Sequence, residues 1–185
     1  CKQKIMCGIV GFTNFSQDSF NNIEVLEAMN NSIEHRGPDE AGIYSQDEIF
    51  LGHRRLSIVD LSSGKQPMKS SDGNLTIVFN GEIYNYKELQ EELKKDGFKF
   101  ETDSDTEVIL NLYRKYHLDF VKHLNGMFAF AIWDKNDENL IMARDRMGEK
   151  PLFYQINKHD VIFASELKAL VKHPAANKQI SKEGL

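Results

Sequence analysis

Residues 127 to 164 read MFAFAIWDKNDENLIMARDRMGEKPLFYQINKHDVIFA. This stretch contains four short apolar runs, and polar segments typical of turns separate them. Short apolar runs bounded by turn residues predict β-strands. The four expected strands are Met127–Trp133, Leu140–Ala143, Leu152–Ile156 and Val161–Ala164. Because the segments between them are short, we expect the four strands to form an antiparallel meander.

The sequence on the N-terminal side of this stretch predicts further strands and helices. Three more apolar runs predict strands at Gly8–Thr13, Glu48–His53 and Leu75–Phe79. Apolar residues at helical spacing predict helices at Asn22–Glu34, at Tyr86–Asp96 after a cap at Asn85, and after the capping box Ser104–Glu107. A last short helix is expected at Ser165–His173, before Pro174. The predicted fold class is therefore α+β, with antiparallel sheets and helices on their outer faces.

Composition excludes several classes of protein. The 185 residues fit one domain, and the net charge of -5, with acids and bases interspersed, argues against nucleic-acid binding. No run approaches the ~18 apolar residues of a membrane span. The two cysteines, Cys1 and Cys7, lie too close together to cross-link the fold, and the scattered histidines predict no metal site. A cytoplasmic location fits this cysteine usage best.

Cys7 is the first candidate for chemistry. It opens the apolar run Cys7–Phe12, where a lone cysteine is usually a small buried hydrophobic residue. The chain begins with Cys1, and Met6 is a better translation start. Removal of Met6 would give Cys7 a free α-amine, which titrates near pH 8 and can accept the thiol proton. Cys7 is therefore a candidate nucleophile that carries its own base, provided that nothing precedes it.

The pair Asn80-Gly81 is the second candidate. Asn-Gly between apolar runs usually marks a tight turn. The functional interpretation is an oxyanion hole, in which the side-chain amide of Asn80 and the backbone N–H of Gly81 donate to the same developing negative charge.

Two charged residues complete the hypothesis. Arg55 lies beside a β-branched run, where arginine is usually a solvated surface residue, but a guanidinium can also bind an α-carboxylate through two parallel hydrogen bonds. Asp105 suits a helix N-terminus and could also bind an ammonium group. In contrast, His35–Asp39 is a turn by composition and has no evident chemistry. A thiol, an oxyanion hole, a cation and an anion together fit one substrate type, free glutamine.

Several ordered motifs resemble the class II glutamine amidotransferases, and among them the glutamine-hydrolysing asparagine synthetases. The resemblance covers about residues 6 to 173. Its motifs are Cys7–Phe12, His35–Asp39, Arg55–Asp60, Asn80–Asn85, Asp103–Ile109, Gly126–Phe130, Ala143–Gly148 and Phe163–Leu170.

This resemblance implies an αββα sandwich of two antiparallel sheets between helical layers, the Ntn-hydrolase fold. It implies Cys7 as the nucleophile, Asn80 and Gly81 as the oxyanion hole, and Arg55 on the carboxylate of glutamine. It places Asp105 and Glu82 near the amino group of glutamine, and it lines the pocket with backbone atoms around Leu56, Ile58 and Val59. It also places residues 144–150 towards a partner domain and the ammonia path.

The same resemblance sets the expected organisation and partners. Residues 1–6 are expected to be an extension or initiator region, residues 7–173 the amidotransferase domain, and residues 174–185 the start of a linker to a C-terminal synthetase domain. No cofactor is expected in this domain, and ATP and Mg are implied only for the synthetase domain, whose pyrophosphate loop is absent from this sequence. Glutamine is the expected ligand. The oligomeric state stays open, with a homodimer among the states allowed.

Three functions remain open at this stage. The first is glutamine hydrolysis that feeds ATP-dependent asparagine synthesis. The second is the same hydrolysis in an enzyme with another acceptor. The third is a non-catalytic glutamine-binding domain, in which residues before Cys7 block the nucleophile.

Overall fold

The computed structural model describes residues 6–56 and 64–179, which form two antiparallel sheets. The first sheet has the strand order β2-β3-β1-β9-β8, and the second has the order β4-β5-β6-β7. The strands are β1 (Gly8–Thr13), β2 (Glu40–Gln46), β3 (Ile49–Arg55), β4 (Met68–Lys69), β5 (Leu75–Ile83), β6 (Gly126–Asp134), β7 (Asn139–Arg144), β8 (Phe153–Asn157) and β9 (Asp160–Ala164). The helices are α1 (Asn22–Ser32), α2 (Tyr86–Lys95), α3 (Asp105–Tyr116), α4 (Leu167–Leu170) and the 3-10 helices η1 (Glu34–Arg36) and η2 (His117–His123).

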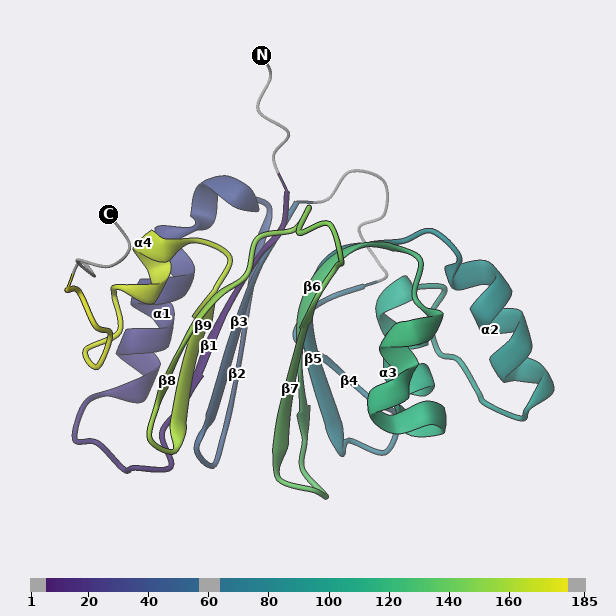
Figure 1. Cartoon of the computed structure of the whole chain (residues 1–185), viewed down its shortest axis with the longest axis horizontal. Helices are drawn as coiled ribbons and strands as arrows, with labels where there is room; N and C mark the ends of the chain where they lie inside the picture. The colour runs from purple at the N-terminus through teal and green to yellow at the C-terminus, as the bar shows by residue number, and fades with distance from the viewer. Residues whose placement is uncertain (1–5, 57–63, 180–185) are drawn as a thin grey trace, which may run out of the picture.

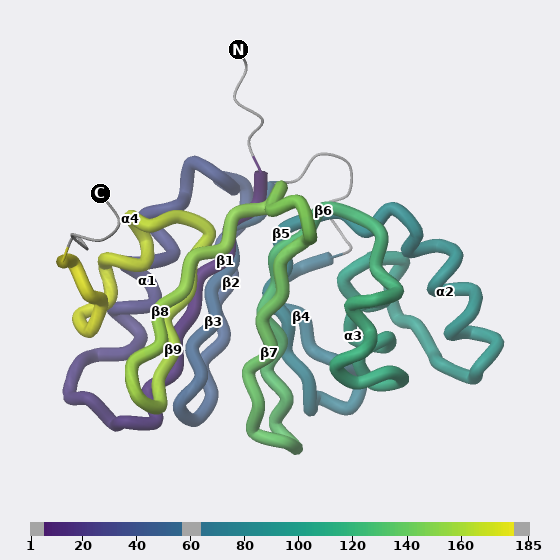
Figure 2. The backbone as a smooth tube through the Cα atoms, viewed as in Figure 1, coloured from purple at the N-terminus to yellow at the C-terminus, as the bar shows by residue number. Residues whose placement is uncertain are grey.

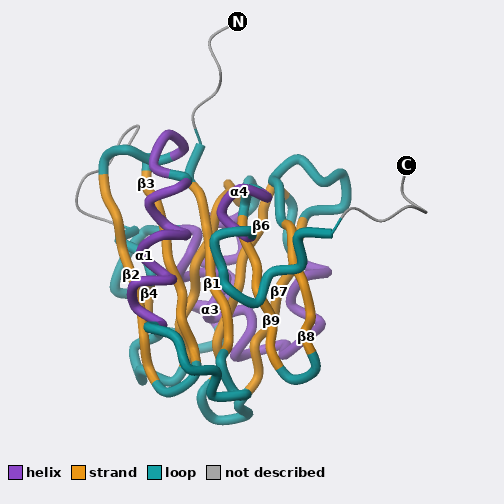
Figure 3. The backbone as a smooth tube through the Cα atoms, turned by 90° about the vertical axis from the view of Figure 1, so that its left-hand side faces the viewer, coloured by secondary structure: helices purple, strands orange, loops and turns teal. Residues whose placement is uncertain are grey.

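The two sheets pack face to face between two helical layers (Figure 1). Helices α1 and α4 cover the outer face of the first sheet, as the turned view also shows (Figure 3), and α2 and α3 cover the second. The described part of the chain is thus an αββα sandwich, as expected. None of its helices has the length and apolar character needed to cross a membrane.

Alternation along the strands divides the core into three layers, because successive side chains point to opposite faces of a sheet. On β1, Val10 and Phe12 pack under α1, whereas Ile9 points to the other sheet. On β5, Ile77 packs under α3, whereas Val78 points to the first sheet. The layer between the sheets contains Ile9, Ile49, Leu51, Val78, Ala129, Ala131, Trp133 and Phe163.

The expected four-stranded meander is wrong. β6 pairs with β7 in the second sheet, and β8 pairs with β9 in the first. The polar segment after β7 is therefore a crossover between the sheets and not a hairpin turn. Two strands were not predicted: the burial of β2 alternates between partly buried and exposed, and β4 has only two residues. Both are edge strands whose apolar pattern is too weak to predict them.

The helix starts agree only in part with the sequence-based predictions. Ser104 caps α3, because its Oγ accepts the N–H of Thr106 at 3.1 Å. Asn85 does not cap α2 with its side chain; its amide donates to the carbonyl of His123 at 3.0 Å and accepts from the N–H of Asn125. The last helix covers only Leu167–Leu170, since Ser165 belongs to the first sheet through its hydrogen bonds with Ile9.

Candidate active site

Successive side chains of a strand point to opposite faces of its sheet. This alternation directs four side chains of the predicted site or next to it into the space between the sheets: Cys7, His53, Arg55 and Asn80. Cys7 precedes Ile9 by two residues, and His53 and Arg55 continue the inward series that contains Leu51. The hydrogen bond between His53 Nε2 and the carbonyl of Phe79, at 3.1 Å, confirms that this end of β3 faces β5. On β5, Asn80 has the same parity as the inward-facing Val78. The N-terminal end of β1 and the C-terminal ends of β3 and β5 therefore meet at one edge of the sandwich (Figure 1).

Cys7 is partly buried and its thiol contacts the end of β3. The backbone N–H of Leu56 lies 3.5 Å from Cys7 Sγ, within the range of a sulfur hydrogen bond. The carbonyl of Cys7 accepts Arg36 Nε at 3.0 Å. The nucleophile candidate is therefore held by one contact at its side chain and one at its backbone.

Arg36 is a residue of the site that the residue-level sequence interpretation missed, because His35–Asp39 was judged a turn without chemistry. Arg36 also binds Glu166 Oε1 at 3.1 Å, and His35 Nε2 contacts the same oxygen at 2.9 Å. Burial works to raise the pKa of Glu166, but hydrogen bonds from Arg36, His35 and Lys168 outweigh it and hold that pKa below its usual value. The structure shows why the turn lies at the site: Gly37 packs directly against β3, since a Cβ there would lie 2.4 Å from the backbone of Arg54.

Asn80 and Gly81 lie inside β5 and do not form the tight turn that Asn-Gly usually indicates. Asn80 is 1% exposed, and its Nδ2 has no hydrogen-bond partner among the described residues. Such a buried donor is uncommon, because leaving it unpaired costs about 1–3 kcal/mol. Gly81 is tightly enclosed, since a Cβ there would lie 2.3 Å from the carbonyl oxygen of Met127.

The backbone N–H of Gly81 points away from β6. Its partner in the register, Phe128, gives both its N–H and its carbonyl to Asp145. N–H groups alternate between the two edges of a strand. The N–H groups of Phe79 and Ile83, two residues before and after Gly81, therefore point to the same edge as that of Gly81, and their partners confirm this direction. Phe79 N donates to Gln66, and Ile83 N donates to Asp105. The Gly81 N–H therefore lies on the edge of β5 that His53 of β3 contacts.

Arg55, at the end of β3 in the first sheet, and the start of α3, which covers the second sheet, approach the same point. Arg55 Nη1 binds Glu40 at 3.1 Å. A Cβ on Gly64 would lie 4.0 Å from Arg55 Nη2 and 3.6 Å from Ser104 Oγ. Arg55 Nη2 therefore lies near Ser104, the residue that caps α3 and directly precedes Asp105.

Asp105 is attached to β5 and has an unusual pKa. Its Oδ2 accepts the N–H of Ile83 at 3.1 Å. Burial raises the pKa of Asp105, the N–H groups of Ile83 and Thr106 oppose this, and the nearby carboxylate of Glu82 raises it further. Glu82 itself is exposed. A cation bound beside these two carboxylates would relieve their repulsion.

The structure thus brings together Cys7, Leu56, Arg55, Asn80, Gly81, Glu82 and Asp105 at one edge. Two predicted lining residues, Ile58 and Val59, lie outside the described residues. No group of three or more potential metal ligands occurs in residues 6–56 and 64–179.

Comparison with known proteins identifies the family of this fold and site. Residues 6–185 match the glutamine amidotransferase domain model. The chain belongs to the glutamine amidotransferase domain family. It is 48% identical over 168 residues to asparagine synthetase [glutamine-hydrolyzing] 1 of Bacillus subtilis, covering 90% of this chain and 27% of that protein. It is 41% identical to amidase chry2 of Gibberella zeae, covering 90% of this chain and 26% of that one.

A solved structure has the same fold. The glutamine phosphoribosylpyrophosphate amidotransferase from B. subtilis aligns with a TM-score of 0.74 and 24% sequence identity, covering 89% of this chain and 43% of that chain. Together the comparisons confirm the predicted family and the αββα fold. The amidotransferase chain spans only about a quarter to a third of the length of the curated relatives it matches.

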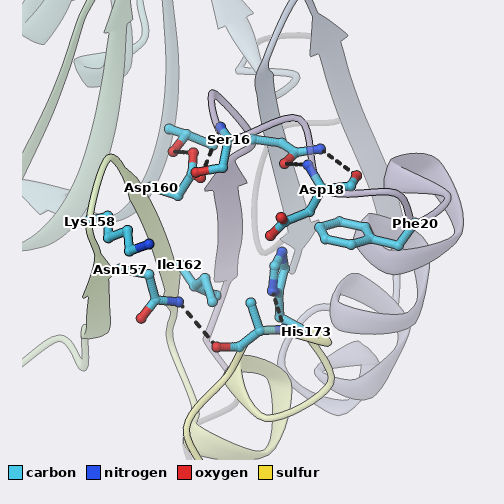
Figure 4. Close-up of a pocket in the computed structure, with 11 residues that line it drawn as sticks. Ser16, Asp18, Phe20, Asn157, Lys158, Asp160, Ile162 and His173 are labelled. Atoms are coloured by element: carbon cyan, nitrogen blue, oxygen red, sulfur yellow. Dashed lines mark hydrogen bonds between the residues drawn. The ribbon is translucent and has the colours of Figure 1, made fainter.

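A pocket of about 600 Å³ in this amidotransferase domain lies away from the predicted site (Figure 4). It is lined by Thr13, at the opposite end of β1 from Cys7, and by the buried His173. His173 Nδ1 accepts the N–H of Ala175, so a neutral ring carries its proton on Nε2, which faces Asp18 in the figure. Among the residues that the structure describes, none of the predicted catalytic or glutamine-binding residues lines this pocket.

Two buried histidines should make the domain sensitive to acid. Burial lowers the pKa of His53 to about 4, although its hydrogen bond to Phe79 opposes the shift, and burial lowers the pKa of His173 to about 4 as well. In the unfolded chain these groups titrate near pH 6.5, so between about pH 6.5 and pH 4 the unfolded state binds more protons than the folded state. The free energy of unfolding should therefore decrease as the pH is lowered through this window, by about 2 kcal/mol per histidine between pH 7 and pH 5.

Urea unfolding at pH 7 and pH 5 measures this loss. The variants H53Q and H173Q should each remove about half of the pH dependence that the histidines cause. An unfolding free energy in either variant that keeps the full wild-type difference between the two pH values would contradict the assignment to that histidine.

Proposed function

We propose that this domain hydrolyses L-glutamine to glutamate and ammonia through a cysteinyl thioester on Cys7. The observation that carries the proposal is the buried Nδ2 of Asn80, which has no partner among the described residues and lies on the inward face of β5, towards the sheet that carries Cys7. An unpaired donor at this place fits a group whose acceptor exists only during the reaction.

The reaction begins with transfer of the Cys7 thiol proton to the α-amine of the same residue, once Met6 has been removed. The thiolate attacks the side-chain amide carbon of glutamine, and the carbonyl oxygen becomes negative. Asn80 Nδ2 and the Gly81 N–H donate to that oxygen. The α-ammonium then returns the proton to the leaving nitrogen, and ammonia departs. Water, deprotonated by the same amine, hydrolyses the thioester and restores the thiol.

The two ends of glutamine are bound by opposite charges. Arg55 binds the α-carboxylate, and its ion pair with Glu40 fixes the guanidinium. Asp105 and Glu82 bind the α-ammonium. Its positive charge would lower the raised pKa of Asp105 towards its usual value. Leu56, Ile58 and Val59 line the pocket through backbone atoms.

In the longer protein we propose that a synthetase domain in cis receives the ammonia and transfers it to an activated acid, β-aspartyl-AMP, with ATP and Mg bound in that domain. The support is the similarity to asparagine synthetases over only a quarter to a third of their length. A free thiol nucleophile fits the reducing cytoplasm. A second candidate is that the same glutaminase serves another acceptor. Its support is that the similar proteins do not all carry the asparagine synthetase name, since the chain is 41% identical to amidase chry2.

A comparison of two chains tests the glutaminase proposal. The chain started at Met6, from which the initiator Met is removed, is expected to release glutamate and ammonia from glutamine, because its Cys7 amine is free. The chain with residues 1–5 retained is expected to be at least about 100-fold slower, because an acylated nitrogen is no base. Intact mass identifies the first residue of each sample, and equal turnover by both would refute the amine as base. Every described helix and strand begins at Gly8 or later, so both chains should fold.

A further inference from the structure

The pocket at the far end of β1 from Cys7 has walls from three segments: the loop after β1, the turn between β8 and β9, and the chain after α4. The loop and the turn run past the same end of the first sheet (Figure 2). The carboxylate of Asp160 joins them, because it accepts the N–H groups of Phe15 and Ser16 at 2.7 and 3.1 Å and the hydroxyl of Thr13 at 2.9 Å. The volume of about 600 Å³ lies within the range of small-molecule sites.

His173 offers this pocket a hydrogen-bond donor that the fold does not use. The residue is 3% exposed, and its Nε2 has no partner in the described part of the chain. Its ring packs edge-on against Phe12 and Phe20, with ring centroids 4.5 and 5.1 Å apart, so its orientation is fixed. Burial lowers the pKa of His173 to about 4, so the ring is neutral at pH 7. Because Nδ1 accepts the N–H of Ala175, Nε2 carries the proton and can donate to an oxygen atom but cannot bind a metal ion.

Opposite charges stand on opposite sides of the pocket (Figure 4). Asp18 lies on the side of His173, and Lys158 lies across the pocket in the turn between β8 and β9. Neither charged side chain forms a hydrogen bond or ion pair with another described residue. The third charge, on Asp160, is offset by the donors of the loop after β1. A ligand with a single charge would meet a like charge on one side, so the pocket favours a molecule that carries both charges.

We propose that this pocket binds a free α-amino acid whose side chain ends in an amide, at a site separate from that of Cys7. An α-amino acid carries an ammonium and a carboxylate on one carbon. Its ammonium can therefore bind Asp18 while its carboxylate accepts the Nε2–H of the neighbouring His173. Asp18 is an exposed side chain, and its rotation towards the ammonium uncovers Nε2. The amide oxygen of the ligand then points across the pocket to Lys158.

The test is a titration of L-glutamine into the C7A chain, which cannot turn it over, with ¹⁵N-histidine labels followed by NMR. The Nε2 signal of His173, assigned with H173Q, should shift in a saturable way, because its proton gains an acceptor. In D18N the Kd from this signal should rise at least about tenfold, since the ammonium loses its counter-charge. The matched control is D47N, because Asp47 is an exposed carboxylate in the turn between β2 and β3 that does not line this pocket. It should leave the Kd unchanged.

Three analogues that each lack one group of glutamine test the proposed contacts separately. Glutaramate lacks the ammonium, 4-aminobutanamide lacks the carboxylate, and L-norvaline lacks the side-chain amide. Each should bind this pocket at least several-fold more weakly than glutamine, and the first two at least about tenfold.

Three results would overturn the proposal. They are an unchanged His173 signal at about 10 mM glutamine, where even weak sites fill, an equal Kd in D18N, and equal binding of all three analogues. The proposal does not depend on the glutaminase function. The signal of His53, which contacts Phe79 beside the Cys7 site, reports glutamine at that site independently.

Discussion

Replacing Cys7 with alanine is expected to abolish glutamine hydrolysis, with a loss of about 10⁴-fold or more in the chain started at Met6, because no thioester can form without the thiol. Glutamine binding should persist, since the groups proposed to hold the substrate, Arg55 and Asp105, remain in place. The fold should persist as well, because Cys7 precedes the first strand and is only partly buried. Glutamate release and isothermal titration with glutamine measure the two effects separately.

Cys7→Ser is the matched variant, because it keeps a nucleophilic atom at the same place. Its hydroxyl is a much weaker nucleophile at neutral pH, so we expect slow but measurable turnover between the wild type and C7A. Glutamine binding without turnover in the wild type itself would favour the non-catalytic binding domain. Undiminished hydrolysis by C7A would exclude Cys7 as the nucleophile.

The sequence predicted the individual strands better than the sheets that they form. The apolar runs gave β1 at its observed bounds, and β5, β6 and β9 within a few residues, because buried strands carry continuous apolar signals. The pattern could not show that β7 and β8 belong to different sheets, since a short connection can be a hairpin or a crossover. That choice depends on Asp145, whose carboxylate binds the backbone of both β6 and the connection.

The residues of the candidate site were also only partly predictable from the sequence. Cys7, Arg55 and Asn80 could be proposed from side-chain chemistry and from family resemblance, and the structure brings them to one edge. Arg36 could not be recognised from its own sequence context, because its partners Cys7 and Glu166 lie far from it in the chain.

Replacing Asn80 with alanine is expected to lower kcat about 10²- to 10³-fold with little change in KM, because its amide stabilises the oxyanion only in the transition state. The structure supports an effect on kcat without an effect on KM. Asn80 is 1% exposed, and its Nδ2 has no partner among the described residues, so the substitution removes no hydrogen bond from that atom in the resting protein. Steady-state kinetics with glutamine give kcat and KM.

The matched control for Asn80 is Asn111, another buried asparagine, which lies on α3 and donates to the carbonyl of Lys99 at 3.4 Å. N111A should lower the free energy of unfolding by about 1 kcal/mol and leave kcat unchanged, because it breaks a structural hydrogen bond away from the site. N80A should do the reverse, with a large loss of kcat at nearly constant stability. If N80A raised KM alone, Asn80 would bind the substrate in its ground state, and the Gly81 N–H would have to stabilise the oxyanion with a different partner.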